Sequence, residues 1–330
     1  MKGIGRLLGV GIAKETSRGT AASSAGFWIP FSEGAAEEKD QKVLNEQTIG
    51  VIEDSVGQSI VKQWSELTIK APIGDAHFPL LLLSFLGSMS NAAHGSETVV
   101  YDHTITVAES SQHQSLTAFL HDPLAGVDYK HANAVASQLE IDYVLGQFLS
   151  YSATLKAKKG ASASSFSPSY TAENRFLPAH LTLKLASSLS GLSGATATQI
   201  KSLKLKIAKN LEDDDVLGSL SPNDFLNKQF SIEGELDLLW NDETFKTLAL
   251  AATPQAMRLD LINNGVTIGS AANPELKIDL ASVVFTQITR PFKINDLVSQ
   301  TVQFKAHYSA SDAKMISIVA TNTQASYLLI

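Results

Sequence analysis

The strongest constraint in this sequence is an order of strands and one short helix that occurs twice. The second copy opens at residues 230–240, where apolar side chains alternate with Glu233, Glu235 and Asp237. A period of two is typical of a half-buried strand. A short helix is predicted at 242–252, where apolar residues recur at helical spacing. Three further strands are predicted at 257–262, 276–285 and 301–308.

The first copy begins near Ser65 and follows the same order. It has an alternating segment at 65–70, an apolar run at 78–86, and segments at 116–120, 139–143 and 152–157. By sequence, 139–143 resembles 276–280, and 152–157 resembles 302–306. We therefore predict a duplicated β-rich unit. The alternative is two unrelated β-meanders that share a common pattern.

The composition along the chain predicts four segments. These are an N-terminal arm at 1–50, a first β unit at 51–160, a linker at 161–180 rich in Gly, Ala and Ser, and a second β unit at 181–330. Strands dominate and helices are short. The fold class is therefore mainly β, with two tandem antiparallel sandwich or barrel units, each flanked by a short helix, and an extended N-terminal arm.

Charge and cysteine content exclude several classes of protein. The 330 residues carry a net charge of −7, which argues against a general affinity for nucleic acid phosphates. The chain has no cysteine, so it forms no disulfide, and this suits a reducing cytoplasm. Because no apolar run reaches about 18 residues, we predict no membrane span.

The sequence offers no catalytic, cofactor or metal site, and we predict that the protein is not an enzyme. It lacks a P-loop, a Gly-x-Ser-x-Gly elbow and a His-Glu-x-x-His motif. Acidic pairs such as Glu140 with Asp142 fit a strand face better than a glycosidase site. The acidic segment 212–215 is interpreted as a solvated turn. Regularly spaced histidines are interpreted as surface or loop residues rather than zinc ligands; they are His103, His113, His121 and His131.

Several short motifs, in order over nearly the whole chain, resemble the major tail (tail tube) proteins of long, non-contractile-tailed bacteriophages. They include GIAKETSRGT at 11–20, FWIPF at 27–31, FLG at 85–87, DHTIT at 102–106, LKIDLASVV at 276–284 and LVSQTVQF at 297–304. The resemblance implies a tail-tube-type β fold and a structural virion protein. Such subunits form rings that stack into a tube and conduct DNA from the capsid to the host. The resemblance also implies synthesis in the bacterial host cytoplasm and a final place in the virion tail.

The partners expected from this resemblance are other copies of the chain and other tail proteins. A duplicated unit favours a trimeric, pseudo-hexameric ring over a hexamer. DNA and the tape measure protein would occupy the lumen without specific binding, and terminator and baseplate proteins would cap the ends. The alternatives are a terminator or baseplate ring protein of the same fold, and, less well supported, a carbohydrate-binding β-sandwich.

Two sets of residues are candidates for tube function. We expect the strand pairs at 137–157 and 275–308 to line the channel, with these charged residues facing the lumen: Glu140, Asp142, Lys156, Lys277 and Asp279. We expect the N-terminal arm to bridge stacked rings through Phe27, Trp28, Ile29 and Phe31.

Overall fold

The computed structural model describes residues 4–47, 50–123 and 126–328. It is mainly β, which confirms the predicted fold class. The strands are β1 (Gly9–Lys14), β2 (Phe27–Ile29), β3 (Glu33–Leu44), β4 (Gln58–Pro72), β5 (Gly87–Ala93), β6 (Tyr101–Val107), β7 (Leu116–His121), β8 (Asp128–Val144), β9 (Ser150–Ala157), β10 (Ala161–Ala163), β11 (Leu181–Ala186), β12 (Ala197–Thr198), β13 (Ser202–Asp214), β14 (Asp224–Leu239), β15 (Gln255–Ile262), β16 (Glu275–Thr289), β17 (Ser299–His307) and β18 (Ile316–Asn322). The helices are α1 (Phe78–Leu86) and α2 (Thr244–Leu250), with short 3-10 turns at Gly5–Leu7, Pro178–His180 and Leu189–Ser193.

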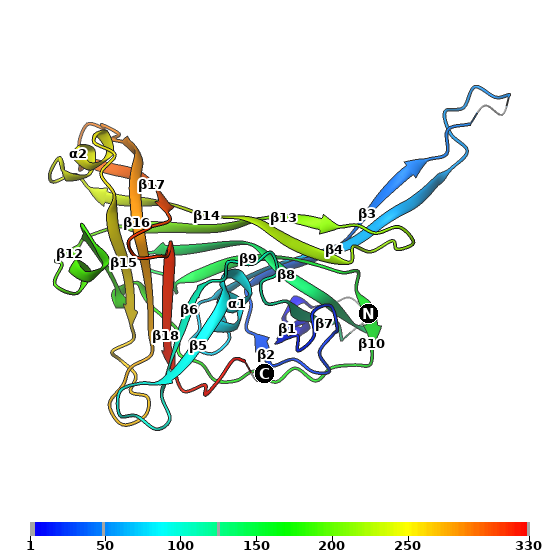
Figure 1. Cartoon of the computed structure of the whole chain (residues 1–330), viewed down its shortest axis with the longest axis horizontal. Coiled ribbons are helices and arrows are strands. Elements are labelled where there is room, and N and C mark those ends of the chain that lie inside the picture. The colour runs from blue at the N-terminus through cyan, green and yellow to red at the C-terminus, as the bar shows by residue number, and fades with distance from the viewer. Residues whose placement is uncertain (1–3, 48–49, 124–125, 329–330) are drawn as a thin grey trace.

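One long antiparallel sheet organises the molecule. Its strand order is β3-β4-β9-β8-β13-β14-β17-β16, and every neighbouring pair is antiparallel. The sheet runs across the upper part of the view in Figure 1, with the other strands and α1 below it. The first part of β8 leaves this sheet to pair with β7 and β10, and the first part of β16 pairs with β15 and β18.

The two halves of the chain use the same pairing scheme, which confirms two tandem units. In the first unit β1 pairs with β7, β7 with β8, β8 with β9, β9 with β4 and β4 with β3. In the second unit β11, β15, β16, β17, β14 and β13 repeat these pairings in the same order. In both units the helix also follows a hairpin in sequence: α1 comes after β3–β4, and α2 comes after β13–β14.

Three β-bulges occur at equivalent places in the two units. The bulge after Ala136 in β8 matches the bulge after Phe285 in β16, 149 positions later. The bulge at Val61 of β4, opposite the step from Gln41 to Lys42 of β3, matches the bulge at Lys228 of β14, opposite the step from Asn210 to Leu211 of β13. Gln41 and Asn210 lie 169 positions apart. A third pair lies in the first parts of β8 and β16, just before Ala134 and Val283, which are again 149 positions apart. A bulge inserts one unpaired residue at a specific point, so three matched bulges favour a repeated unit over a shared general pattern.

These bulges also correct the alignment expected from the sequence. With a spacing of 149 positions, Leu139 corresponds to Ile288 and not to Leu276. The sequence comparison matched the second part of β8 to the first part of β16. It failed because the alternation of apolar and polar residues continues along both long strands, so the pattern alone does not fix the register.

The segment before residue 51 is not a separate arm, and the expected boundaries of 1–50 and 51–160 are therefore wrong. Strand β1 pairs with both β2 and β7, and Ile12 and Ile29 are fully buried in the core. Strand β3 forms a hairpin with β4. The first unit thus begins at β1. The apolar alternation in these short strands was hidden among glycines, which gave the segment the composition of a loop.

The core lies between the long sheet and the strands below it. All nine residues of α1 are buried there, and its four consecutive leucines place apolar side chains on every side of the helix. Helix α2 buries Phe245 against Phe285 of β16 and leaves Leu250 exposed. Neither of these helices is long and apolar enough to cross a membrane, within the part of the chain that the structure describes.

Candidate functional site

One face of the long sheet is charged and the other is buried. On β13, Lys204 and Lys206 are exposed, whereas Leu203, Leu205 and Ile207 between them are fully buried. The same period of two holds on β4, β8, β14 and β17. The charged or amide side chains of this face include Glu66, Glu140, Asp142, Lys156, Lys204, Lys206, Glu233, Glu235, Gln303 and Lys305. We call this surface the charged face.

Charges of opposite sign lie opposite one another across the strands of the charged face. Lys206 of β13 lies opposite Glu140 of β8 on one side and Glu233 of β14 on the other. The Lys206 Nζ is 3.6 Å from a Glu140 carboxylate oxygen, and Lys305 of β17 donates to Glu233 at 3.0 Å. Exposed pairs of this kind contribute little stability, typically below about 1 kcal/mol. Their main effect is to leave the face without a large field of one sign.

A denser ion cluster ties the base of the β3–β4 hairpin to the end of β13. Lys62 and Lys156 both donate to Asp213, at 2.6 and 2.7 Å, and Lys62 also donates to Asp215. Both lysines also lie over the ring of Trp64. Burial alone would raise the pKa of Asp213, but the hydrogen bonds from the two lysines outweigh it and lower that pKa. Interpreting 212–215 as a solvated turn was therefore wrong for Asp213.

The structure brings together only part of the expected channel set. Glu140, Asp142 and Lys156 lie on the charged face. Asp279 lies instead in the first part of β16, where it receives two hydrogen bonds from Arg258 of β15, and Lys277 pairs with Glu275. Lys277 and Asp279 lie away from the charged face because β16 changes its pairing partner from β15 to β17 near Val283. The expected channel set omitted Lys204, Lys206, Glu233 and Lys305, although Lys204 and Lys206 alternate with apolar residues over 203–207.

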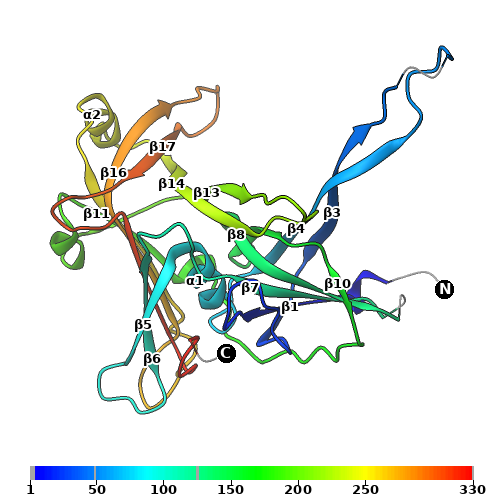
Figure 2. The ribbon, with the colours of Figure 1, turned by 45° about the vertical axis from the view of Figure 1, so that its right-hand side comes forward.

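Both ends of the long sheet are open edges among the described residues. Within the part of the chain that the structure describes, strand β3 pairs only with β4, and its other edge has no ladder partner. Beyond Val283, β16 pairs with β17 and with no other strand of residues 4–47, 50–123 and 126–328. These two edges lie at opposite ends of the molecule in Figures 1 and 2. Unpaired edges are sites where a further strand can add.

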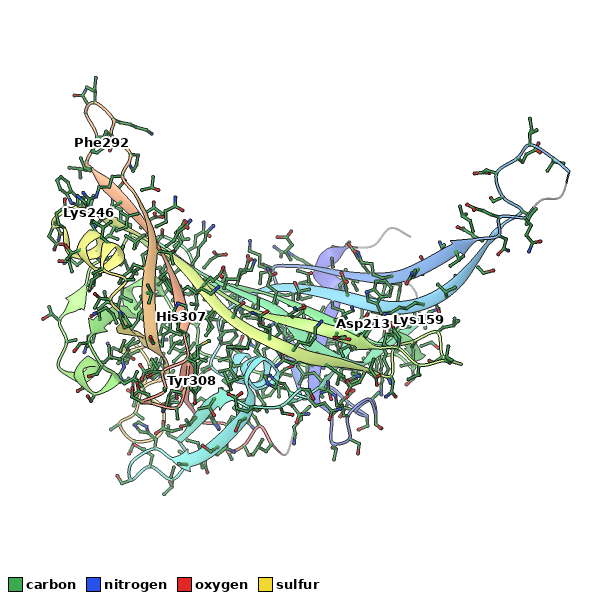
Figure 3. The ribbon with its side chains drawn as sticks, turned by 45° about the horizontal axis from the view of Figure 1, so that its top comes forward. Lys159, Asp213, Lys246, Phe292, His307 and Tyr308 are labelled. Atoms are coloured by element: carbon green, nitrogen blue, oxygen red, sulfur yellow. The ribbon has the colours of Figure 1, made fainter. Side chains whose placement is uncertain are left out.

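The outer part of the β3–β4 hairpin projects away from the body of the protein (Figure 2). Eleven of the twelve residues of β3 are exposed, so the hairpin has almost no packing of its own. Its exposed apolar residues are Val43, Leu44, Val51, Ile52, Val56, Ile60 and Val61. Asp213 and Lys159 lie near the base of the hairpin in Figure 3. An apolar, extended element of this kind is typical of an interaction site.

The aromatic residues expected to bridge rings are instead part of the subunit's own core. Phe27 is 7% exposed and Ile29 is fully buried. Trp28 is half-buried against Phe119 and Phe166, and Phe31 packs at the edge of the core. The expectation that they bridge rings is therefore wrong for this conformation, because β1 and β2 close one side of the first unit.

The β16–β17 loop also carries exposed apolar side chains. Phe292 is 79% exposed, Ile294 93% and Leu297 71%. Phe292 lies at the outer tip of this hairpin in Figure 3, above α2 and Lys246. Arg290, at the base of the loop, lies over the Trp240 ring and pairs with Glu243 of the loop before α2.

The four regularly spaced histidines do not converge, but interpreting them as surface or loop residues was wrong for His103, His113 and His131, which are buried. His103 bonds to Asn91 and Asn322, whereas His121 pairs with Asp128. His113 lies against two backbone carbonyl groups, and His131 faces Glu38. Within residues 4–47, 50–123 and 126–328, no group of three His, Asp or Glu side chains is placed to hold a metal ion.

The fold and the charged face define a mainly β protein whose long sheet has one charged side, one core side and, among the described residues, an open edge at each end. A family model described as "Phage tail tube protein" matches residues 5–306, and the chain belongs to this family. No curated protein matches the sequence. The family assigns the chain a structural role in the tail tube of a phage virion.

Proposed function

We propose that three copies of this chain form a ring, that rings stack into the tail tube, and that the tube conducts DNA from the capsid into the host. One observation carries this proposal: a single continuous sheet spans two repeated units and ends in an open edge on each side. Joining such edges head to tail around a closed ring removes them and leaves no strand exposed to aggregation.

The dimensions of such a ring suit a DNA channel. Each copy supplies the eight strands of the long sheet, so three copies supply 24. With strands about 4.8 Å apart and tilted by about 40°, a barrel of this size has a backbone diameter of roughly 50 Å. Side chains reduce this opening, but it remains wide enough for a double helix. Two units per chain make the ring pseudo-sixfold.

The charged face is proposed to line the channel. Its lysines are already opposed by carboxylates, such as Lys206 by Glu140 and Glu233. A lysine held this way is poorly available for a DNA phosphate, and few phosphate contacts mean little counterion release and weak binding. DNA and the tape measure protein would then pass without specific contacts. We propose no catalytic step for this surface.

The β3–β4 hairpin is proposed to join successive rings. It projects from the sheet and presents apolar residues near its tip, including Leu44 and Ile52. A contact between this tip and a different surface of the next ring repeats without closing, and so generates a filament. Terminator and baseplate proteins would occupy the two ends of that filament. The subunit would be made in the cytoplasm of the bacterial host.

Electron microscopy of the purified protein tests this function. The proposal predicts hollow tubes or stacked rings, and an abundant band of about this mass, 35.3 kDa, among virion proteins. A terminator or baseplate ring protein would instead give single rings and a minor band. A stable monomer that is absent from virions would contradict the proposal.

A further inference from the structure

We propose that the ring closes through one antiparallel seam of defined register, in which residues 33–39 of one copy pair with residues 287–293 of the next copy. This inference rests on the proposed assembly into rings. It specifies which strand pairs with each open edge and which residue lies opposite each position.

The chain already contains a template for this seam. The two units are joined inside one chain by β8 of the first unit and β13 of the second, which pair from Ser202 opposite Val144 to Ala208 opposite Gln138. The counterpart of β8 in the second unit is β16, and the counterpart of β13 in the first unit is β3. Repeating the internal joint between two copies therefore places β16 of one copy beside β3 of the next.

The matched bulges fix the register of the seam. Positions in β16 lie 149 after their counterparts in β8, and positions in β13 lie 169 after their counterparts in β3. The internal pair of Lys206 with Glu140 thus predicts Glu37 opposite Thr289. The start of β3 agrees with this register, because Glu33 lies 169 positions before Ser202, where β13 begins.

The ends of the strands indicate that a neighbour is missing at this edge. Strand β8 continues to Val144, whose counterpart is Lys293, and β13 pairs with it to that point. Strand β16, with no neighbour there, ends at Thr289. Residues 290–293 are outside any strand in the single chain. We infer that β16 extends over these four positions when the next copy binds.

The side chains at the two edges are complementary in size. In the internal joint, large residues meet, since Leu203 pairs with Tyr143 and Leu205 with Ile141. The corresponding pairs of the seam are Gly34 with Phe292 and Ala36 with Arg290. Small residues on β3 therefore face the two large side chains of the β16 end, and Phe292, now 79% exposed, gains a partner strand. The charges agree as well, because Glu33 would lie opposite Lys293.

Pro291 is compatible with this seam. The Trp240 amide donates to the Val298 carbonyl. This bond determines which residues of β14 direct their backbone groups toward β17 and which direct them toward β13. Alternate residues of a strand direct their backbone groups to opposite neighbours. Following this alternation from β14 through β13 to β8 places the Asp142 amide on the side of β8 away from β13. Pro291 is the counterpart of Asp142, so its missing N–H lies on the side away from the incoming strand.

Cysteine cross-linking tests the register, and the chain has no cysteine of its own to interfere. By the same alternation of backbone hydrogen bonds, Glu37 and Thr289 would form a non-hydrogen-bonded pair. Their Cα atoms would be about 4.5 Å apart, within the range that a disulfide spans. We expect the Glu37→Cys/Thr289→Cys protein to form inter-subunit disulfides on oxidation of its assemblies, with covalent trimers as the largest closed product. Both side chains are exposed, so folding should be unaffected.

Two matched variants serve as controls for the cross-linking experiment. Glu140→Cys/Lys206→Cys marks the equivalent pair inside one chain, and we expect it to oxidise within the monomer. Glu37→Cys/Gln287→Cys shifts the register by two residues on the same face, and we expect at least a tenfold lower yield of cross-linked product.

Tubes that cross-link equally well or better in the shifted variant would overturn the seam while leaving the tube function intact. The absence of tubes or rings from the unmodified protein would overturn the proposed function itself, and the seam with it.

Discussion

Ala136 and Phe285 hold the same place in the two halves of the chain, each as the last paired residue before a bulge, opposite Leu155 and Phe304 respectively. This equivalence makes the chain a tandem pair of similar β units. The internal joint between β8 and β13 then has the same form as the joint proposed between copies.

Changes at the tip of the β3–β4 hairpin should block stacking and leave rings intact. Replacing Leu44 and Ile52 by Asp introduces charge where the account places an apolar contact with the next ring, and both residues are exposed in the subunit. We expect soluble trimers but no long tubes, measured by light scattering and electron microscopy. Leu217→Asp, at the fully exposed turn of the β13–β14 hairpin, is the control and should still give tubes. Long tubes from the Leu44/Ile52 variant would contradict this role.

Charge reversal on the charged face should slow DNA passage without preventing assembly. Glu140→Lys and Glu233→Lys together leave Lys206 unopposed and add free ammonium groups that can bind phosphates. We expect tubes of normal length and a slower release of DNA, with the defect relieved at higher salt. Glu109→Lys, exposed in the loop after β6, makes one such change elsewhere. Normal DNA delivery by the double variant would argue against this face as the lumen.

The buried amine of Lys209 should make stability depend on pH. Its Nζ donates to the Ser84 carbonyl at 2.7 Å and lies near His113, and burial, followed by repulsion from Arg18, lowers the pKa of Lys209 to about 7. The unfolded chain keeps the ordinary pKa of 10.5 and so binds more protons between pH 7 and 10. The free energy of unfolding should therefore rise with pH in this window, by about 2 kcal/mol from pH 7 to 9.

Urea unfolding of unassembled subunits at pH 7 and 9 measures this effect. The Lys209→Met protein should lose most of the rise, whereas Lys204→Met, at an exposed position, should keep it. An equal rise in the wild-type and Lys209→Met proteins would show that another group is responsible.

Glu15 should be a strong determinant of stability because it anchors the N-terminal segment. Glu15 is 2% exposed, and its carboxylate accepts hydrogen bonds from Ser115 Oγ, Thr117 Oγ1 and the amides of Gly19 and Asn133. Glu15→Ala leaves these donors without their partner, and we expect a loss of about 3 kcal/mol in unfolding free energy. Glu235→Ala, on the charged face, should cost less than about 0.5 kcal/mol. A negligible loss for Glu15→Ala would mean that the segment is not docked.

The sequence predicted the fold class well because alternation and short helices are local signals. The strand predicted at 257–262 and the helix in the apolar run at 78–86 are both in place. The register of the repeat was not predictable, since Leu139 and Leu276 sit in equally good alternating patterns and only the bulges separate them. Phe27 and Ile29 were misplaced because short core strands between glycine-rich loops carry too little periodicity to show which partner they bind.

The charged face was predicted only in part for a different reason. Glu140, Asp142 and Lys156 belong to it, but the switch of β16 from β15 to β17, which removes Lys277 and Asp279, is a tertiary feature. Asp213 was likewise interpreted as solvated because both of its lysine partners are far away in sequence.

Electron cryomicroscopy of assembled tubes, with the number of chains counted in one ring, tests the central claim most directly. The account predicts three chains per ring, six wall segments in near-sixfold arrangement and continuous strand pairing around the lumen, with residue 37 beside residue 289 of the next copy. Six chains per ring, or rings whose β3 edges remain unpaired, would contradict it.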